Sequence, residues 1–136
     1  MTTKIKIGIV GSRGYTDKRK IKDLLFKIKQ KHDDVEIVSG GQKQGADNIA
    51  KKYSLEFGME YVEFPPSHYQ HNMHCKLSAN HYSKPYYISN YFKRNKQIAK
   101  YCDMIIAFIP DGVESRGTMD TIKHAEKEKK MTRILN

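Results

Sequence analysis

The sequence predicts an α/β sandwich with a mostly parallel, five-stranded sheet, and three observations support this prediction. β-type runs of apolar residues alternate with helical patterns five times along the chain, as in strands joined by crossover helices. The run at 103–109 is the most apolar, which is typical of a central strand covered on both faces. A length of 136 residues fits one domain, 1–136, with a single core.

The first strand is expected at 4–10, where basic and apolar residues alternate before the chain becomes Gly-Ile-Val. Thr16 or Asp17 can then cap a helix that ends at His32-Asp33-Asp34. The apolar positions of this helix recur at helical spacing: Ile21, Leu24, Leu25 and Ile28.

The next strand, 35–38, leads through a glycine turn into a helix at about 46–57. Gly58 fits the left-handed position that ends many helices. A third strand follows at 60–64 and is stopped by Pro65-Pro66. These elements complete the predicted first half of the sheet.

The second half begins with a long loop insertion at about 67–90, rich in His and Tyr and poor in aliphatic residues. Loops of this length in compact domains are usually functional or mobile. A helix is predicted at 91–101, followed by the apolar strand 103–109, a helix at about 119–129 and a short strand at 131–135.

Composition indicates a soluble, cytoplasmic protein with an anionic partner. No 18-residue apolar run or signal-peptide core occurs, so no membrane partner is expected. The net charge is +10, which attracts anions, but most basic residues are lysines on helix faces that are usually just solvated. Nucleic acid is therefore not the expected partner, since no zinc finger, RNP-type motif or DNA-reading helix is present. Cys102 is expected to be a buried thiol.

The stretch 38–47, Val-Ser-Gly-Gly-Gln-Lys-Gln-Gly-Ala-Asp, is the strongest candidate for a ligand site. A strand that feeds a glycine turn and opens a helix presents free N–H groups and the positive end of the helix dipole, which suits a phosphate. Gly40 and Gly41 can adopt positive φ and allow close approach. Asp47 can cap N–H groups or accept from a ligand hydroxyl. Alternatively, these are plain turn glycines.

Polar turns follow other predicted strands as well, and the carboxyl ends of parallel strands form a common crevice. Ser12 and Arg13 can hold a phosphate, or they are a turn serine and a surface arginine. Gly117-Thr118 can bind phosphate before a helix, or Ser115 or Thr118 is an ordinary N-cap.

The His-rich loop leaves three interpretations open: a lid or base-stacking surface, an unremarkable loop, or a zinc site. No metal is the main expectation, because no Cys-x-x-Cys pair occurs. The weaker zinc alternative would use His68, His71, His74 and Cys75.

As a set, these motifs resemble the YspA-like, DUF2493-type branch of the SLOG superfamily. The matching stretches are Gly-Ser-Arg-x-Tyr-x-Asp (11–17), Ser-Gly-Gly-x-x-x-Gly-Ala-Asp (39–47), Phe-Pro (64–65), Arg-Asn (94–95) and Gly-x-x-Ser-Arg-Gly-Thr (112–118). The superfamily includes the "lonely guy" phosphoribohydrolases and the DprA-like proteins. The resemblance implies a Rossmann-like fold that binds nucleotides or nucleotide-derived signals in bacteria or phage-infected cells, and a homo-oligomer.

The resemblance favours a binding protein over an enzyme. In the hydrolase relatives a catalytic glutamate follows the Gly-Thr motif, and the matching position here is Thr121. Arg94 and Asp120 are the remaining weak catalytic candidates, since cleavage of an N-glycoside needs a carboxylate. Asp120 is a poor substitute because it lies about 100° around the helix.

The sequence therefore predicts a sensor or sequestering protein for a nucleotide-type ligand, with phage counter-defence as one setting and no required cofactor. A nucleotide N-glycoside hydrolase and a nucleic-acid-binding module remain the alternatives. The predicted ligand-binding residues are Gly11, Ser12, Arg13, Ser39, Gly40, Gly41, Gly45, Asp47, Pro65, Arg94, Asn95, Ser115, Arg116, Gly117 and Thr118.

Overall fold

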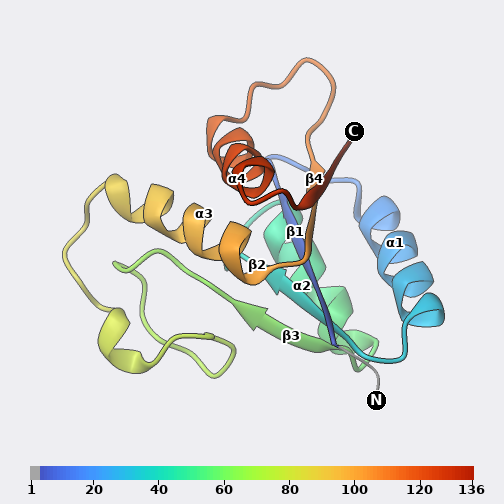
Figure 1. The fold of residues 1–136 in the computed structure, drawn as a ribbon, viewed down its shortest axis with the longest axis horizontal. Helices are drawn as coiled ribbons and strands as arrows, with labels where there is room; N and C mark the ends of the chain where they lie inside the picture. Colours follow the sequence, from blue (N-terminus) through green and yellow to red (C-terminus); the bar gives the residue numbers. More distant parts are fainter. Residues whose placement is uncertain (1–3) are drawn as a thin grey trace.

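A computed structural model of the chain describes residues 4–136. These residues form an α/β layer structure whose five strands all run parallel (Figure 1). The sheet has the order β3-β2-β1-β4-β5, which confirms the predicted Rossmann-like architecture. Its strands are β1 (Ile5–Gly11), β2 (Val35–Ser39), β3 (Glu60–Glu63), β4 (Met104–Phe108) and β5 (Met131–Leu135).

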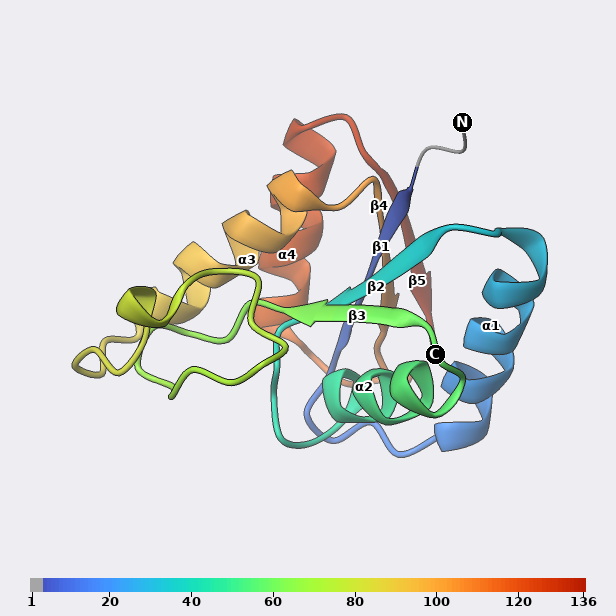
Figure 2. The same ribbon diagram turned by 90° about the horizontal axis from the view of Figure 1, so that it is seen from below.

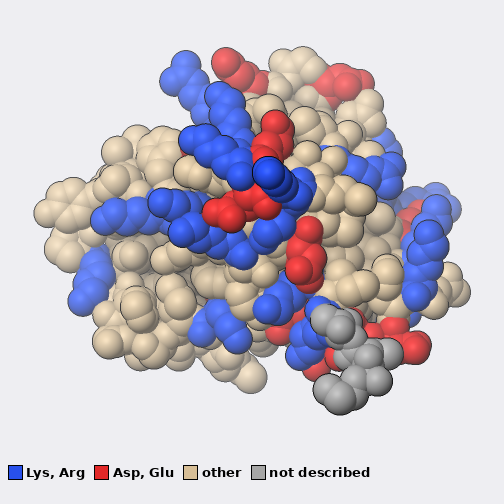
Figure 3. Space-filling view, viewed as in Figure 1, with Lys and Arg blue, Asp and Glu red and all other residues tan. Residues whose placement is uncertain are grey.

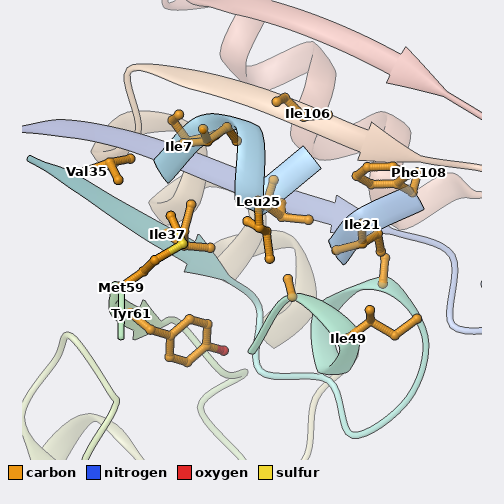
Figure 4. Close-up of a cluster of buried hydrophobic side chains, with 14 of the residues drawn as sticks. Ile7, Ile21, Leu25, Val35, Ile37, Ile49, Met59, Tyr61, Ile106 and Phe108 are labelled. Atoms are coloured by element: carbon orange, nitrogen blue, oxygen red, sulfur yellow. The ribbon is translucent and has the colours of Figure 1, made fainter. Parts of the chain in front are cut away.

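Two pairs of helices cover the two faces of the sheet (Figure 2). On one face lie α1 (Lys18–Lys31) and α2 (Ala46–Glu56), and on the other α3 (Ser89–Tyr101) and α4 (Arg116–Lys127). Alternate residues of each strand therefore enter separate cores. Ile7 packs under α1 and α2 (Figure 4). Ile9 belongs to the same core, whereas Val10 packs under α3 and α4.

Local sequence signals explain where the first helices begin and end. The Asp17 side chain accepts a hydrogen bond from the Lys20 N–H and so caps α1, as predicted. Gly58 adopts φ +69° after α2, which also confirms the prediction. By contrast, α3 and α4 begin two and three residues earlier than predicted, because their first turns carry polar residues without apolar periodicity.

The segment 64–88 contains a single 3₁₀ turn, η1 (Ala79–His81), and otherwise no regular element. Backbone hydrogen bonds fix it to the domain: Glu63 N–H donates to His74, and Lys76 N–H to Glu63. The ring of Tyr82 is buried beneath it. The predicted long loop is therefore an ordered surface segment attached to the end of β3.

Lysine and arginine side chains gather on the surface over α3 and α4 and along the outer side of α1 (Figure 3). The exposed residues there include Lys93, Lys96 and Lys100 on α3 and Lys123 on α4. Across residues 4–136, the helices are all too short or too polar to cross a membrane.

Candidate functional site

A cleft of about 550 Å³ opens where β1 and β4 end and where the order of strands along the sheet reverses. This is the place at which parallel α/β sheets bind ligands, and the volume lies within the ordinary range for small-molecule sites. Ten of the predicted ligand-binding residues line it: Gly11, Ser12, Arg13, Asp47, Arg94, Asn95, Ser115, Arg116, Gly117 and Thr118.

Arg94 is the cationic centre of this cleft and is only 7% exposed. Its Nη1 donates to the carbonyl oxygens of Gly40 and Phe64, and its Nε donates to Asn95 Oδ1 at 3.0 Å. Among residues 4–136, Nη2 has no hydrogen-bond partner. Burial lowers the pKa of the Arg94 guanidinium, and the nearby Asp47 carboxylate opposes this shift. An arginine nevertheless remains charged in proteins, so the two N–H donors of Nη2 are left for a ligand.

The start of α4 supplies a second set of donors. Its N-cap residue, Ser115, makes no side-chain hydrogen bond to the helix backbone. Instead Ser115 Oγ donates to Thr118 Oγ1 at 2.8 Å. The first N–H groups of the helix thus lack a side-chain cap. The helix start lines the cleft at Gly117, where a Cβ would meet nothing within 4 Å. This helix end is built to accept an anion.

Asp47 is a buried carboxylate at the start of α2, 6% exposed, and its Oδ2 accepts a hydrogen bond from the Gln42 N–H at 3.3 Å. Burial raises the pKa of Asp47 to about 6, although the Arg94 guanidinium and the Gln42 N–H act in the opposite direction. The cleft therefore holds a carboxyl group that titrates close to neutral pH and can donate or accept a hydrogen bond.

The raised pKa of Asp47 predicts a pH-dependent stability. Between pH values of about 4 and 6 the folded chain binds more protons at Asp47 than the unfolded chain does. The free energy of unfolding therefore falls as pH rises through that window. The residue in Asp47→Asn stays neutral at every pH. Between about pH 4 and 7 the free energy of unfolding of this variant should therefore rise relative to that of the wild type, by up to about 3 kcal/mol. Urea unfolding of both proteins across this range checks it; a difference that does not change with pH would contradict it.

The three glycines of the turn after β2 (Gly40, Gly41 and Gly45) do not line the cleft, although Gln42 of the same turn does. A Cβ on Gly40 would sit 2.3 Å from Arg94 Nη1 and 2.8 Å from Asp47 Oδ2, so the missing side chain makes room for Arg94. The expectation that Gly40 uses positive φ is wrong, whereas Gly41 (φ +71°) and Gly45 (φ +75°) do. The turn therefore positions Arg94 and Asp47.

Ser39, Gly40, Gly41, Gly45 and Pro65 are the five predicted ligand-binding residues outside the lining, and their contact with a ligand stays a prediction. Ser39 Oγ bonds the Tyr61 hydroxyl, and Gly41 packs against Glu63 and Pro65. Gly45 lies so close to the backbone of Ser12 that a Cβ would come within 2.2 Å of its carbonyl oxygen.

The weak catalytic candidate Asp120 also lies outside the lining of the cleft. Its Oδ2 accepts from Asn95 Nδ2 at 3.2 Å and lies 3.6 Å from His124 Nε2. Thr121 lines the cleft, but its hydroxyl donates to the Gly117 carbonyl. Its position one residue around the helix explains why Asp120 does not reach the cleft.

The His-rich loop does not assemble the alternative zinc site. Within residues 4–136, no three His, Cys, Asp or Glu side chains come close enough to hold a metal ion. His68 packs against Tyr69, Tyr86 and Tyr91, His71 against Tyr82 and His74 against Tyr61. Cys75 Sγ is near the Asn72 N–H.

Sequence reasoning did not single out seven cleft residues that the structure reveals. Helical periodicity could have indicated those near the start of α3, but nothing in the sequence shows that this end of the helix faces the cleft. These residues are Val10, Gln42, Ile88, Tyr91, Phe92, Ile98 and Glu114. Tyr86 was already a candidate for stacking on a base, as part of the His- and Tyr-rich loop.

Solved structures confirm the fold. The chain is similar to the molybdenum cofactor binding protein from the phototrophic bacterium Rippkaea orientalis, with a TM-score of 0.73 and 19% identity over 100% of this chain and 78% of that chain. A Moco carrier protein from Chlamydomonas reinhardtii gives 0.65 and 18% (98% and 76% covered). Another structure of the molybdenum cofactor carrier protein from that alga gives 0.69 and 16% (97% and 76%).

These comparisons correct one expectation from the sequence. All three structures are described as proteins that bind or carry the molybdenum cofactor. This finding contradicts the expectation that no cofactor is required, and it leaves a nucleotide-type ligand as a prediction.

The sequence comparisons concern the first half of the chain. No curated protein gives a significant match. Residues 5–71 match the model of the family described as "YspA, cpYpsA-related SLOG family". This stretch spans β1 to β3 and contains the Gly-Ser-Arg and Ser-Gly-Gly motifs. Over this stretch the chain is a YspA-like protein of the SLOG superfamily.

Proposed function

We propose that the cleft binds a small phosphorylated ligand and that its phosphate lies at the start of α4. The observation that carries this proposal is the pairing of an uncapped helix N-terminus with a buried guanidinium whose Nη2 is unpaired within residues 4–136. Arg13 and Arg116 add two exposed cations to the same lining. Helix N–H groups and arginine forks are the groups that bind phosphate most readily in proteins.

A molybdenum-cofactor-type molecule is the first candidate, because the similar structures bind or carry that cofactor. Such a cofactor joins a pterin ring system to a phosphate and holds its metal through its own sulfur atoms, so the protein need not supply metal ligands. The residues of the cleft fit this chemistry: Arg94 and the start of α4 would hold the phosphate, and Asp47 can bond polar atoms of the ring. The cofactor would be cargo that these residues bind and shield.

A nucleotide-derived signalling molecule, sensed or sequestered, is the second candidate. It is supported by Asp47, a buried carboxylate that lines the cleft and can accept hydrogen bonds from ribose hydroxyls. Hydrolysis of such a ligand is less well supported. The position that matches the catalytic glutamate carries Thr121, and Asp120 lies outside the lining. Binding without turnover therefore fits the geometry better.

Gly117 offers a direct test of the phosphate position. Because a Cβ there meets nothing within 4 Å, Gly117→Asp should fold normally, and its carboxylate favours a helix N-terminus. The same negative charge should repel a phosphate and weaken binding of neopterin monophosphate and guanosine 5′-monophosphate about tenfold or more. Isothermal titration measures the affinities, and urea unfolding measures the stability.

Gly117→Asn is the matched control, since asparagine has nearly the same size without the charge. It should keep the wild-type affinity for both probes. If both variants fold and bind the probes with equal affinity, the claim that the phosphate lies at the start of α4 is contradicted.

A further inference from the structure

Three large apolar side chains near the start of α3 are exposed and line the cleft together. Tyr86 is 63% exposed, Ile88 66% and Phe92 46%. We call these three residues the apolar wall. The polar donors of the cleft come from the turn after β1, the start of α4 and, one turn further along α3, Arg94. Exposed apolar side chains that gather at a cleft mark a surface that gains from being covered.

The apolar wall is held in place by buried contacts. Asn90 is 6% exposed, and its Nδ2 donates to the Pro85 carbonyl at 3.2 Å and to His68 Nδ1 at 3.1 Å. The His68 ring in turn packs edge-on against Tyr86 at 4.7 Å between centroids and against Tyr91 at 5.1 Å. Burial and the Arg94 charge lower the pKa of His68, which favours the neutral ring that accepts from Asn90. Such support reduces the ordering that a ligand would have to impose.

Tyr91 does not itself offer a free stacking face. The guanidinium of Arg13 lies 5.4 Å from the centre of its ring, and that of Arg94 lies 5.8 Å away. These cation–π contacts join the turn after β1 to α3 across the cleft. Tyr86 has no such cation over its ring among residues 4–136. Tyr86, the more exposed of the two, and Phe92 are therefore the aromatic rings of the cleft that remain available to a ligand.

We propose that the apolar wall, with Tyr86 at its centre, binds the planar ring of the ligand and makes the cleft selective for heterocyclic phosphates over sugar phosphates. This inference rests on the proposed function and adds the ring as a second determinant. Stacking of a heterocycle on an aromatic side chain contributes about 1–3 kcal/mol per ring by alanine substitution. A sugar phosphate would use the phosphate-binding groups but gain nothing from the apolar wall.

The test compares two probes that share a phosphate on a ribose, guanosine 5′-monophosphate and ribose 5-phosphate. In the wild type the nucleotide should bind more tightly. Tyr86→Ala should weaken the nucleotide about tenfold and leave ribose 5-phosphate unchanged, while Tyr86→Phe should keep the wild-type preference. Tyr87→Ala is the matched control, because Tyr87 is equally exposed but does not line the cleft.

The outcomes separate the two claims. Equal affinities of wild type and Tyr86→Ala for the nucleotide would overturn the ring subsite while leaving the phosphate position intact. An equal loss for both probes would also overturn it. If neither probe binds the wild type, the proposed function fails and the inference fails with it. Sensitivity of both probes to Gly117→Asp would independently support the phosphate position.

Discussion

Replacing Arg94 with methionine is expected to lower the free energy of unfolding by about 3 kcal/mol or more and to abolish ligand binding. The substitution leaves the carbonyl groups of Gly40 and Phe64 without their donor in a buried position. It also removes the cation that opposes the raised pKa of Asp47. Urea unfolding and titration with guanosine 5′-monophosphate measure the two effects.

Arg116→Met is the matched control for Arg94, because Arg116 lines the same cleft but is exposed. Its loss should change stability by about 0.5 kcal/mol or less while weakening the binding of a phosphate. If Arg94→Met is as stable as the wild type, the guanidinium does not hold the turn after β2 in place.

Gly45→Ala is expected to destabilise the fold by about 2–4 kcal/mol, for two separate reasons. Gly45 has φ +75°, which disfavours any residue with a Cβ, and an added Cβ would lie 2.2 Å from the Ser12 carbonyl oxygen. The position of the added Cβ is fixed by the backbone of residue 45, and the atoms that it meets are backbone atoms of Ser12 and Arg13. No side-chain rotation can therefore relieve the clash. The clash would push the start of α2 away from the turn after β1.

Gly58→Ala isolates the first of these two reasons. Gly58 has φ +69°, but a Cβ there would meet nothing within 4 Å. Its replacement should therefore cost only the conformational term, about 1 kcal/mol. Urea unfolding of both variants provides the comparison. Equal losses would show that the close approach of Gly45 to Ser12 does not contribute to stability.

Patterns that act over a few residues predicted most of the fold. The alternation of apolar strands with amphipathic helices is enough to predict a parallel sheet. Asp17 and Gly58 mark helix ends through contacts within one helical turn. The starts of α3 and α4 were misplaced because their first turns carry few apolar residues. Packing of the rest of each helix extends them to Ser89 and Arg116.

The location of the cleft was also predictable, because the carboxyl ends of parallel strands share one edge. The sequence did not predict which of these residues line the cleft and which only hold the lining residues in position. Gly40 and Gly41 have the sequence of a phosphate-binding turn, yet the space they leave is filled by Arg94 and Glu63. The side chains that fill this space lie more than twenty residues away in the sequence, and local sequence patterns do not reveal such contacts. Ile88 and Phe92 of the apolar wall escaped detection for the same reason, whereas Tyr86 was a candidate for stacking on a base.

Mass spectrometry of the small molecules released by heat from the purified protein tests the central claim most directly. The protein would be produced in cells that make the molybdenum cofactor, and Gly117→Asp would be purified in parallel. The expected result is one phosphorylated heterocycle, near-stoichiometric in the wild type and depleted in the variant. A wild-type protein that releases no phosphorylated compound under these conditions, or releases it equally from the variant, would contradict the claim.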